Sequence, residues 1–90
     1  MPQVVWTRGA ALDLQAIRAY IDQFSPLAAQ RMAARLVQAA RSLETLPDRG
    51  RIISRGRREL AVIAPYLIRY RHQADQVVIL EIRHGARMPD

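Results

Sequence analysis

Hydrophobic residues in the first half of the chain recur at intervals of three and four, the period of an amphipathic helix. The first stripe follows a short β-type run, Gln3–Trp6, and Thr7 offers a hydroxyl that can cap the helix after it. The second stripe follows Ser25-Pro26, where serine is a good N-cap and proline a good first helical residue. The stripes comprise Ala10, Leu14, Ile17, Ile21 and Phe24, and then Ala29, Ala33, Leu36, Ala40 and Leu43.

These two stripes predict an antiparallel helix hairpin, because only about two residues connect them. The alanines of the second stripe allow the helices to approach closely. We expect the second helix to end near Leu46, before Pro47 and the turn-forming residues 48–50. A hairpin alone cannot bury both stripes completely, so a sheet must cover the remaining face.

The second half of the chain supplies that sheet. Strands are predicted over Arg58–Ala64, Tyr66–His72 and Gln76–Arg83, with a shorter extended piece at Ile52–Ile53. Residues 73–75 form the turn between the last two strands. The pattern therefore predicts an α+β fold of order β-α-α-β-β-β, in which the N-terminal antiparallel helix hairpin packs on a small, mainly antiparallel, twisted sheet.

Alternation in the middle strand separates two sets of side chains. Tyr66, Ile68 and Tyr70 fall on one side, where we expect them in the core with tyrosine hydroxyls at its rim. Leu67, Arg69 and Arg71 fall on the other side, where the arginines are expected to face solvent or a partner.

Composition narrows the range of functions. Ninety residues, 50% of them hydrophobic and 24% charged, fit one globular domain over residues 1–90. The chain has no cysteine, and two histidines are too few for a metal cluster, so we expect no metal and no cofactor. No apolar run reaches the roughly 18 residues of a membrane span, and the N-terminus lacks a secretory pattern. These features predict a cytoplasmic protein without membrane contact.

The charge is strongly positive and is carried by arginine alone. Fourteen arginines against eight acidic residues give a net charge of +6, and there is no lysine. Residues 46–90 hold nine of the arginines against five acids. This excess predicts that an acidic partner or nucleic acid binds the second half of the chain. Codon bias in an arginine-favouring genome is the alternative explanation for the absence of lysine.

Several spaced matches give the chain a resemblance to the RelE/ParE superfamily of bacterial toxins from type II toxin–antitoxin modules. The superfamily contains ribosome-dependent messenger RNA endonucleases (RelE-like) and poisons of DNA gyrase (ParE-like). The matching residues are Trp6, Asp13-Leu14, Ile17, Tyr20-Ile21, Ser25-Pro26, Ala40 and Leu43 before Pro47, Gly50-Arg51, Arg58-Glu59-Leu60, and the stretches 65–71 (PYLIRYR) and 77–87 (VVILEIRHGAR).

Two positions favour the ParE-like branch. The nucleases commonly carry an arginine three residues before the strand tyrosine, which corresponds here to Leu67 before Tyr70. Their C-terminal histidine or tyrosine would fall near Gly85-Ala86, which cannot titrate. If the chain were a nuclease, Glu59, Arg83 and His84 would have to supply the acid, base and charge. A degenerate toxin that binds its antitoxin without harming the cell is a third hypothesis.

The ParE-like resemblance implies a toxin that inhibits gyrase, functions in plasmid stabilisation, and is neutralised by the C-terminal segment of a ParD-like antitoxin. Operator DNA would be contacted only indirectly, through the antitoxin. An acidic or amphipathic segment suits a sheet edge with a basic open side. The candidate contacts for antitoxin or target are Arg51, Arg57, Arg58, Leu67, Arg69, Arg71, Arg83 and Arg87.

Overall fold

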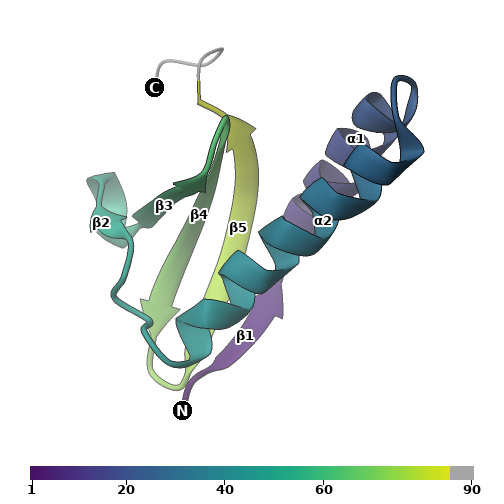
Figure 1. The fold of residues 1–90 in the computed structure, drawn as a ribbon. Coiled ribbons are helices and arrows are strands. Elements are labelled where there is room, and N and C mark those ends of the chain that lie inside the picture. Colours follow the sequence, from purple (N-terminus) through teal and green to yellow (C-terminus); the bar gives the residue numbers. More distant parts are fainter. Residues whose placement is uncertain (86–90) are drawn as a thin grey trace.

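Two helices lie on one face of a five-stranded sheet, and no helix among the described residues covers the other, open face (Figure 1). The computed structural model describes residues 1–85, apart from the side chain of Val62. The elements are β1 (Gln3–Trp6), α1 (Arg8–Asp22), α2 (Pro26–Arg41), a 3₁₀ turn at Ser42–Glu44, β2 (Arg51–Ile52), a 3₁₀ turn at Ser54–Gly56, β3 (Arg58–Ile63), β4 (Tyr66–Gln73) and β5 (Gln76–His84).

The strand order is β1-β5-β4-β3-β2, with β1 parallel to β5 and the other neighbours antiparallel. The predicted α+β fold is confirmed. The extended piece expected at Ile52–Ile53 is β2, shifted by one residue, and it pairs with the start of β3. No helix in the described part of the chain is both long and apolar enough to cross a membrane.

Both predicted helix caps are present. The Thr7 hydroxyl oxygen accepts a hydrogen bond from the N–H of Ala10 at 3.1 Å, and the Ser25 hydroxyl accepts one from Ala28 at 3.1 Å. The second helix ends earlier than expected, at Arg41. A 3₁₀ turn follows it, in which the Ser42 carbonyl accepts the N–H groups of both Thr45 and Leu46.

The core lies between the helices and the covered face of the sheet. Its largest fully buried side chains are Leu36, Leu43, Ile68, Tyr70, Val77 and Ile79. Tyr66, Ile68 and Tyr70 are buried together, as the alternation in β4 predicts. The prediction for Phe24 is wrong: it is 73% exposed, because the free end of the hairpin extends beyond the sheet (Figure 1).

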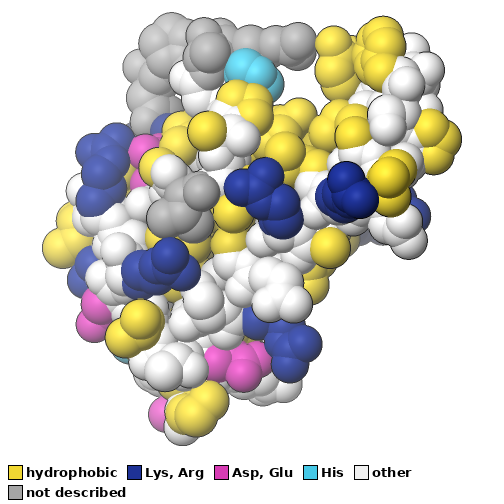
Figure 2. Space-filling view, viewed as in Figure 1, with side chains coloured by type: hydrophobic (Ala, Val, Ile, Leu, Met, Phe, Trp, Pro, Cys, Tyr) yellow, Lys and Arg dark blue, Asp and Glu magenta, His cyan; other side chains and the backbone are white. Residues whose placement is uncertain are grey.

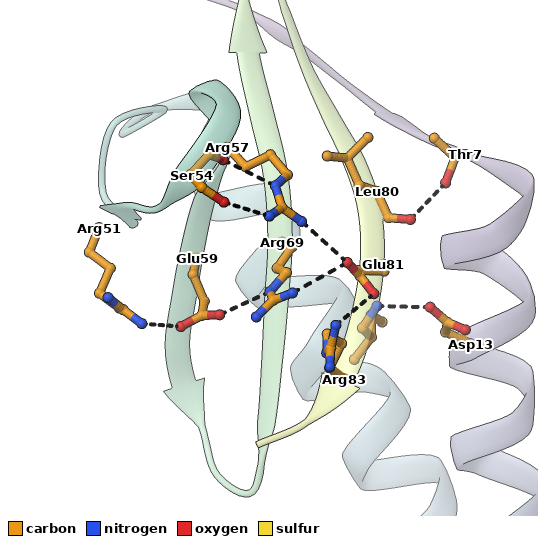
Figure 3. A network of polar contacts seen from close by, with 11 residues as sticks. Thr7, Asp13, Arg51, Ser54, Arg57, Glu59, Arg69, Leu80, Glu81 and Arg83 are labelled. Atoms are coloured by element: carbon orange, nitrogen blue, oxygen red, sulfur yellow. Dashed lines mark hydrogen bonds and ion pairs between the residues drawn. The ribbon is translucent and has the colours of Figure 1, made fainter. Parts of the chain in front are cut away.

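A bulge in β5 determines which side chains reach the open face. Arg69 pairs with Glu81, but the next residue, Tyr70, pairs with Ile79, so Leu80 is an extra residue. Ile79 and Ile82 therefore both face the core, and Glu81 points to the open side. Helix α1 and its N-cap support the bulge, since the Thr7 hydroxyl donates to the Leu80 carbonyl and the Asp13 carboxylate accepts the N–H of Ile82 at 2.9 Å (Figure 3).

Candidate functional site

A row of alternating charges crosses the open face of the sheet. Arg51 on β2 pairs with Glu59 on β3, Glu59 with Arg69 on β4, and Arg69 with Glu81 on β5. Directly opposite residues on neighbouring strands share a face, so the four side chains form one ladder. Its oxygen–nitrogen distances are 2.8 Å, 3.0 Å and 3.7 Å in that order (Figure 3).

Further arginines border this ladder. Arg57 and Arg83 each approach Glu81, at 3.9 Å and 3.8 Å, and Arg71 donates a hydrogen bond to the Arg55 carbonyl. We call the whole group the arginine face: Arg51, Arg57, Arg69, Arg71 and Arg83, together with Glu59 and Glu81. Five positive and two negative charges give this surface a net charge of +3.

The position of Arg69 corrects the sequence prediction. It was expected to face solvent or a partner, but only 3% of the residue is exposed. Glutamates stand opposite it on both neighbouring strands, and its Nε donates to Glu59 at 3.0 Å. A buried guanidinium requires such partners, because an uncompensated charge in the interior is strongly destabilising. Arg69 therefore lies beneath the surface of the arginine face, where it pairs with Glu59 and Glu81 and does not face solvent.

Glu59 is held as a carboxylate. Burial would raise its pKa, but the hydrogen bonds from Arg69 and then Arg51 outweigh that effect, and the pKa lies below the ordinary 4.5. At neutral pH this group has no proton to donate. Both of its oxygens already accept charge-assisted hydrogen bonds, so it is also a poor proton acceptor.

One predicted contact residue, Arg58, stands apart from the arginine face. Arg58 pairs with Tyr70 on the covered side of the sheet, and it donates to the carbonyls of Asp48 and Gly50. It therefore holds the loop before β2 in place. Arg87 lies outside the described residues. Leu67 does share the open face, where it pairs with Arg83.

His84 lies on the opposite side of the sheet from Glu59. It pairs with Tyr66, and their rings meet edge to face with centroids 5.6 Å apart. It lines a hollow of about 410 Å³ with Ala16, Ile17, Tyr20, Pro65, Tyr66 and Ile82. Its Nδ1 is buried and has no hydrogen-bond partner in the described structure. The three residues that a nuclease would need are thus divided, with Glu59 and Arg83 on one face and His84 on the other.

Hydrophobic side chains gather at the free end of the helix hairpin, next to this hollow (Figure 2). Tyr20 is 52%, Phe24 73% and Leu27 53% exposed, and the rings of Tyr20 and Phe24 meet edge to face. We call these three residues the hairpin tip. An exposed apolar cluster of this kind is typical of a protein-binding surface. The helical period assigns Phe24 to the core, so it does not predict this exposed cluster.

Among the described residues, no group of three or more His, Asp or Glu side chains is arranged to hold a metal ion. Glu81 is the main feature of the site that sequence reasoning missed. The alternation of β5 could not place it, because the bulge at Leu80 changes which face the following residues meet.

Comparison with known proteins gives the family. Residues 4–89 match the family described as the ParE toxin of type II toxin-antitoxin system, parDE. This chain belongs to the ParE toxin family. It is therefore the toxin component of a type II toxin–antitoxin system. The ParE family match agrees with the branch that Leu67 and Gly85-Ala86 favoured from the sequence.

Two relatives extend the comparison of this ParE-family toxin. It is 60% identical over 89 residues to Toxin RelE2 of Caulobacter vibrioides, an alignment that covers 98% of this chain and 100% of that protein. Its structure is similar to the chromosomal ParDE system from P. aeruginosa, with a TM-score of 0.81 and 27% identity. That match covers 93% of this chain and 96% of the other. The toxin–antitoxin context indicates an antitoxin as partner.

Proposed function

We propose that this toxin acts by binding and inhibiting DNA gyrase, without catalysis of its own, and that the C-terminal segment of a ParD-like antitoxin neutralises it. The observation that carries the proposal is the separation of Glu59 from His84 by the sheet. A poison that works by binding needs a surface of the right shape and charge, but it needs no assembled acid–base pair.

Cleavage of RNA by attack of a 2′-hydroxyl needs a proton acceptor, a proton donor and positive charge around one phosphate. Arg83 offers charge on the open face. Glu59, two strands away on β3, is held by hydrogen bonds from two arginines and has a lowered pKa, and the His84 ring lies on the helix side of the sheet. A phosphate on the arginine face would therefore meet positive charge without a proton-transfer pair, which favours the binding mechanism.

Two surfaces suit an antitoxin segment. The arginine face, at +3, attracts acidic side chains, whereas the hairpin tip and its adjoining hollow accept apolar ones. These surfaces lie on opposite sides of the sheet. A segment that uses both must pass around the end of the sheet, and it must be amphipathic. Operator DNA would then be bound by the antitoxin, with this chain attached only through its partner.

The direct test is a supercoiling and DNA-cleavage assay with purified toxin and gyrase from the same host. We expect loss of supercoiling and accumulation of double-strand breaks, both reversed by the product of the neighbouring antitoxin reading frame. Toxin that is lethal in cells but leaves gyrase unaffected would overturn the proposal. The proposed target implies a cytoplasmic site of action and, where the module lies on a plasmid, a role in plasmid stabilisation.

The nuclease alternative needs its own assay, since the Caulobacter relative carries the name RelE2. Messenger RNA is incubated with ribosomes and toxin, and the variants Glu59→Gln, Arg83→Ala and His84→Gln are compared with wild type. We expect no toxin-dependent cleavage. Cleavage at codon boundaries that Arg83→Ala abolishes would establish the enzyme instead. Unchanged growth on expression without antitoxin would identify a degenerate toxin.

A further inference from the structure

Glu81 differs from Glu59 in how it meets the arginines of the arginine face. Glu59 is almost fully buried and accepts short hydrogen bonds at 2.8 Å and 3.0 Å. Glu81 keeps a third of its side chain exposed, and it lies 3.7 Å to 3.9 Å from three guanidinium groups at once. These distances exceed a hydrogen bond, so Glu81 acts on Arg57, Arg69 and Arg83 mainly through its charge. Figure 3 shows the three arginines converging on it.

We propose that Glu81 is a specificity-determining residue that prevents the arginine face from binding the phosphodiester backbone of nucleic acid. Of the three arginines, Arg57 and Arg83 reach the surface, with 21% and 16% of their side chains exposed. They come from different segments of the chain, and the Glu81 carboxylate lies between them. A phosphate that approached either arginine would also approach this carboxylate, and like charges repel.

A protein partner can satisfy the same surface. Phosphate oxygens of DNA only accept hydrogen bonds, and they have nothing to offer a carboxylate. A polypeptide can place an N–H or hydroxyl group beside Glu81 while its acidic side chains meet Arg57 and Arg83. The row of opposite charges thus selects a partner of mixed polarity over a uniform polyanion. If the proposed function holds, this selection keeps a protein of net charge +6 from being held by the DNA on which gyrase works.

The first comparison uses two variants that lose the same charge. Glu81→Gln removes the carboxylate from the arginine face, and Asp22→Asn removes one from the exposed end of α1. Binding of the full-length chain to a fluorescent oligothymidylate is measured by anisotropy across a range of salt. We expect about a tenfold gain in affinity for Glu81→Gln over Asp22→Asn near 0.1 M salt. The salt dependence should steepen by about 0.7 for each arginine that becomes engaged.

Further variants test which arginine is responsible for the gain in oligonucleotide affinity. In the Glu81→Gln background, Arg83→Ala should abolish the gain, whereas Arg31→Ala, on the exposed side of α2, should keep it. Glu81→Asp keeps the net charge but withdraws the carboxylate by one methylene. It should give an intermediate affinity that overall charge cannot explain, and it provides a readout even if Glu81→Gln fails to fold.

Equal binding by Glu81→Gln and Asp22→Asn, with Glu81→Asp equal to wild type, would overturn the proposal. So would a wild-type protein that already binds the oligonucleotide as tightly as Glu81→Gln does. Neither result bears on gyrase inhibition, which is measured in a different assay.

Discussion

The phenolic oxygen of Tyr70 accepts a hydrogen bond at 2.8 Å from the backbone N–H of Gly50, twenty residues earlier in the chain. The same hydroxyl donates to the Pro47 carbonyl at 2.8 Å. One fully buried ring thus fastens the loop that leads into β2, and with it Arg51, the first member of the charge ladder. Because the loop comes so close to the ring, Gly50 has no room for a side chain.

Gly50→Ala is expected to destabilise the fold by about 1–3 kcal/mol. An added Cβ would lie 2.8 Å from a ring carbon of Tyr70 and 3.0 Å from the Glu59 carbonyl, so the loop or the ring must move. Gly9→Ala is the matched control. Its Cβ would meet nothing nearer than 3.9 Å, and alanine in α1 should stabilise by about 0.5–1 kcal/mol. Urea unfolding measures both, and a Gly50→Ala variant as stable as wild type would contradict the packing described here.

High pH should weaken the fold through Tyr70. Burial raises the pKa of this phenol above its ordinary 10.0, and the hydrogen bond from Gly50 offsets only part of that effect. Between these two pKa values the unfolded chain has released the proton and the folded chain still holds it. The Tyr70 titration therefore leaves the free energy of unfolding unchanged below pH 10 and lowers it as the pH rises through the folded-state pKa.

The variant Tyr70→Phe separates this titration from the loss of the hydrogen bonds. At neutral pH it should cost about 1–3 kcal/mol, because the Gly50 N–H and the Pro47 carbonyl lose their partner. Its deficit relative to wild type should shrink as the pH rises above 10. Tyr20→Phe, at an exposed position, should follow the wild-type profile. A deficit that stays constant with pH would exclude Tyr70 as the group responsible.

Much of the fold follows from local rules that the sequence displays. Thr7 and Ser25 cap their helices because each stands directly before a periodic apolar stripe, and this needs no knowledge of the rest of the chain. The charge ladder is different, since it depends on the register between four strands. Strict alternation along β5 would place Ile79 and Glu81 on the same side, and only the bulge at Leu80 separates them.

The burial of Arg69 also could not be predicted from the sequence. Its alternation with Tyr70 was correctly predicted, but the open side of a sheet is not everywhere exposed. Arg69 can be buried because the strand register places two glutamates beside it, and neither glutamate is near Arg69 in the sequence. The division of Glu59 from His84 has the same origin, because strand pairing and the bulge together assign each residue to a face.

Removing the Glu59 carboxylate should lower the free energy of unfolding far more than removing an exposed acidic side chain. Glu59→Ala takes from the buried Arg69 guanidinium the nearer of its two glutamates, a change that typically costs about 3–5 kcal/mol. Glu59→Gln keeps an acceptor and should cost less, and Asp22→Ala should have little effect. Thermal and urea unfolding measure all three variants. Loss of toxicity in Glu59→Ala would then reflect lost folding, and equal stability of Glu59→Ala and Asp22→Ala would contradict this interpretation.

Acid should remove the contribution of Glu59. Its pKa in the folded state lies below the ordinary 4.5, so its contribution is present above that value and is lost as the pH falls through the folded-state pKa. In this window the unfolded chain binds more protons than the folded chain. Glu59→Gln should accordingly show a shallower loss of stability between pH 5 and the acid limit. Parallel profiles for wild type and variant would assign the acid sensitivity to other carboxylates.

The hairpin tip offers a test in which stability and binding should separate. Phe24 is largely exposed and its only described ring contact is with Tyr20, so Phe24→Ser should change the free energy of unfolding by no more than about 0.5 kcal/mol. If the antitoxin covers the tip, the same change removes an aromatic contact from that interface and should weaken binding at least about tenfold. Leu36→Ala is the contrasting variant, because Leu36 is fully buried between the helices and the sheet and its truncation should cost about 2–5 kcal/mol. Calorimetric titration with the antitoxin, together with urea unfolding of the free toxin, distinguishes the two effects. A Phe24→Ser toxin that binds its antitoxin as tightly as wild type would leave the arginine face, and not the hairpin tip, as the surface where neutralisation takes place.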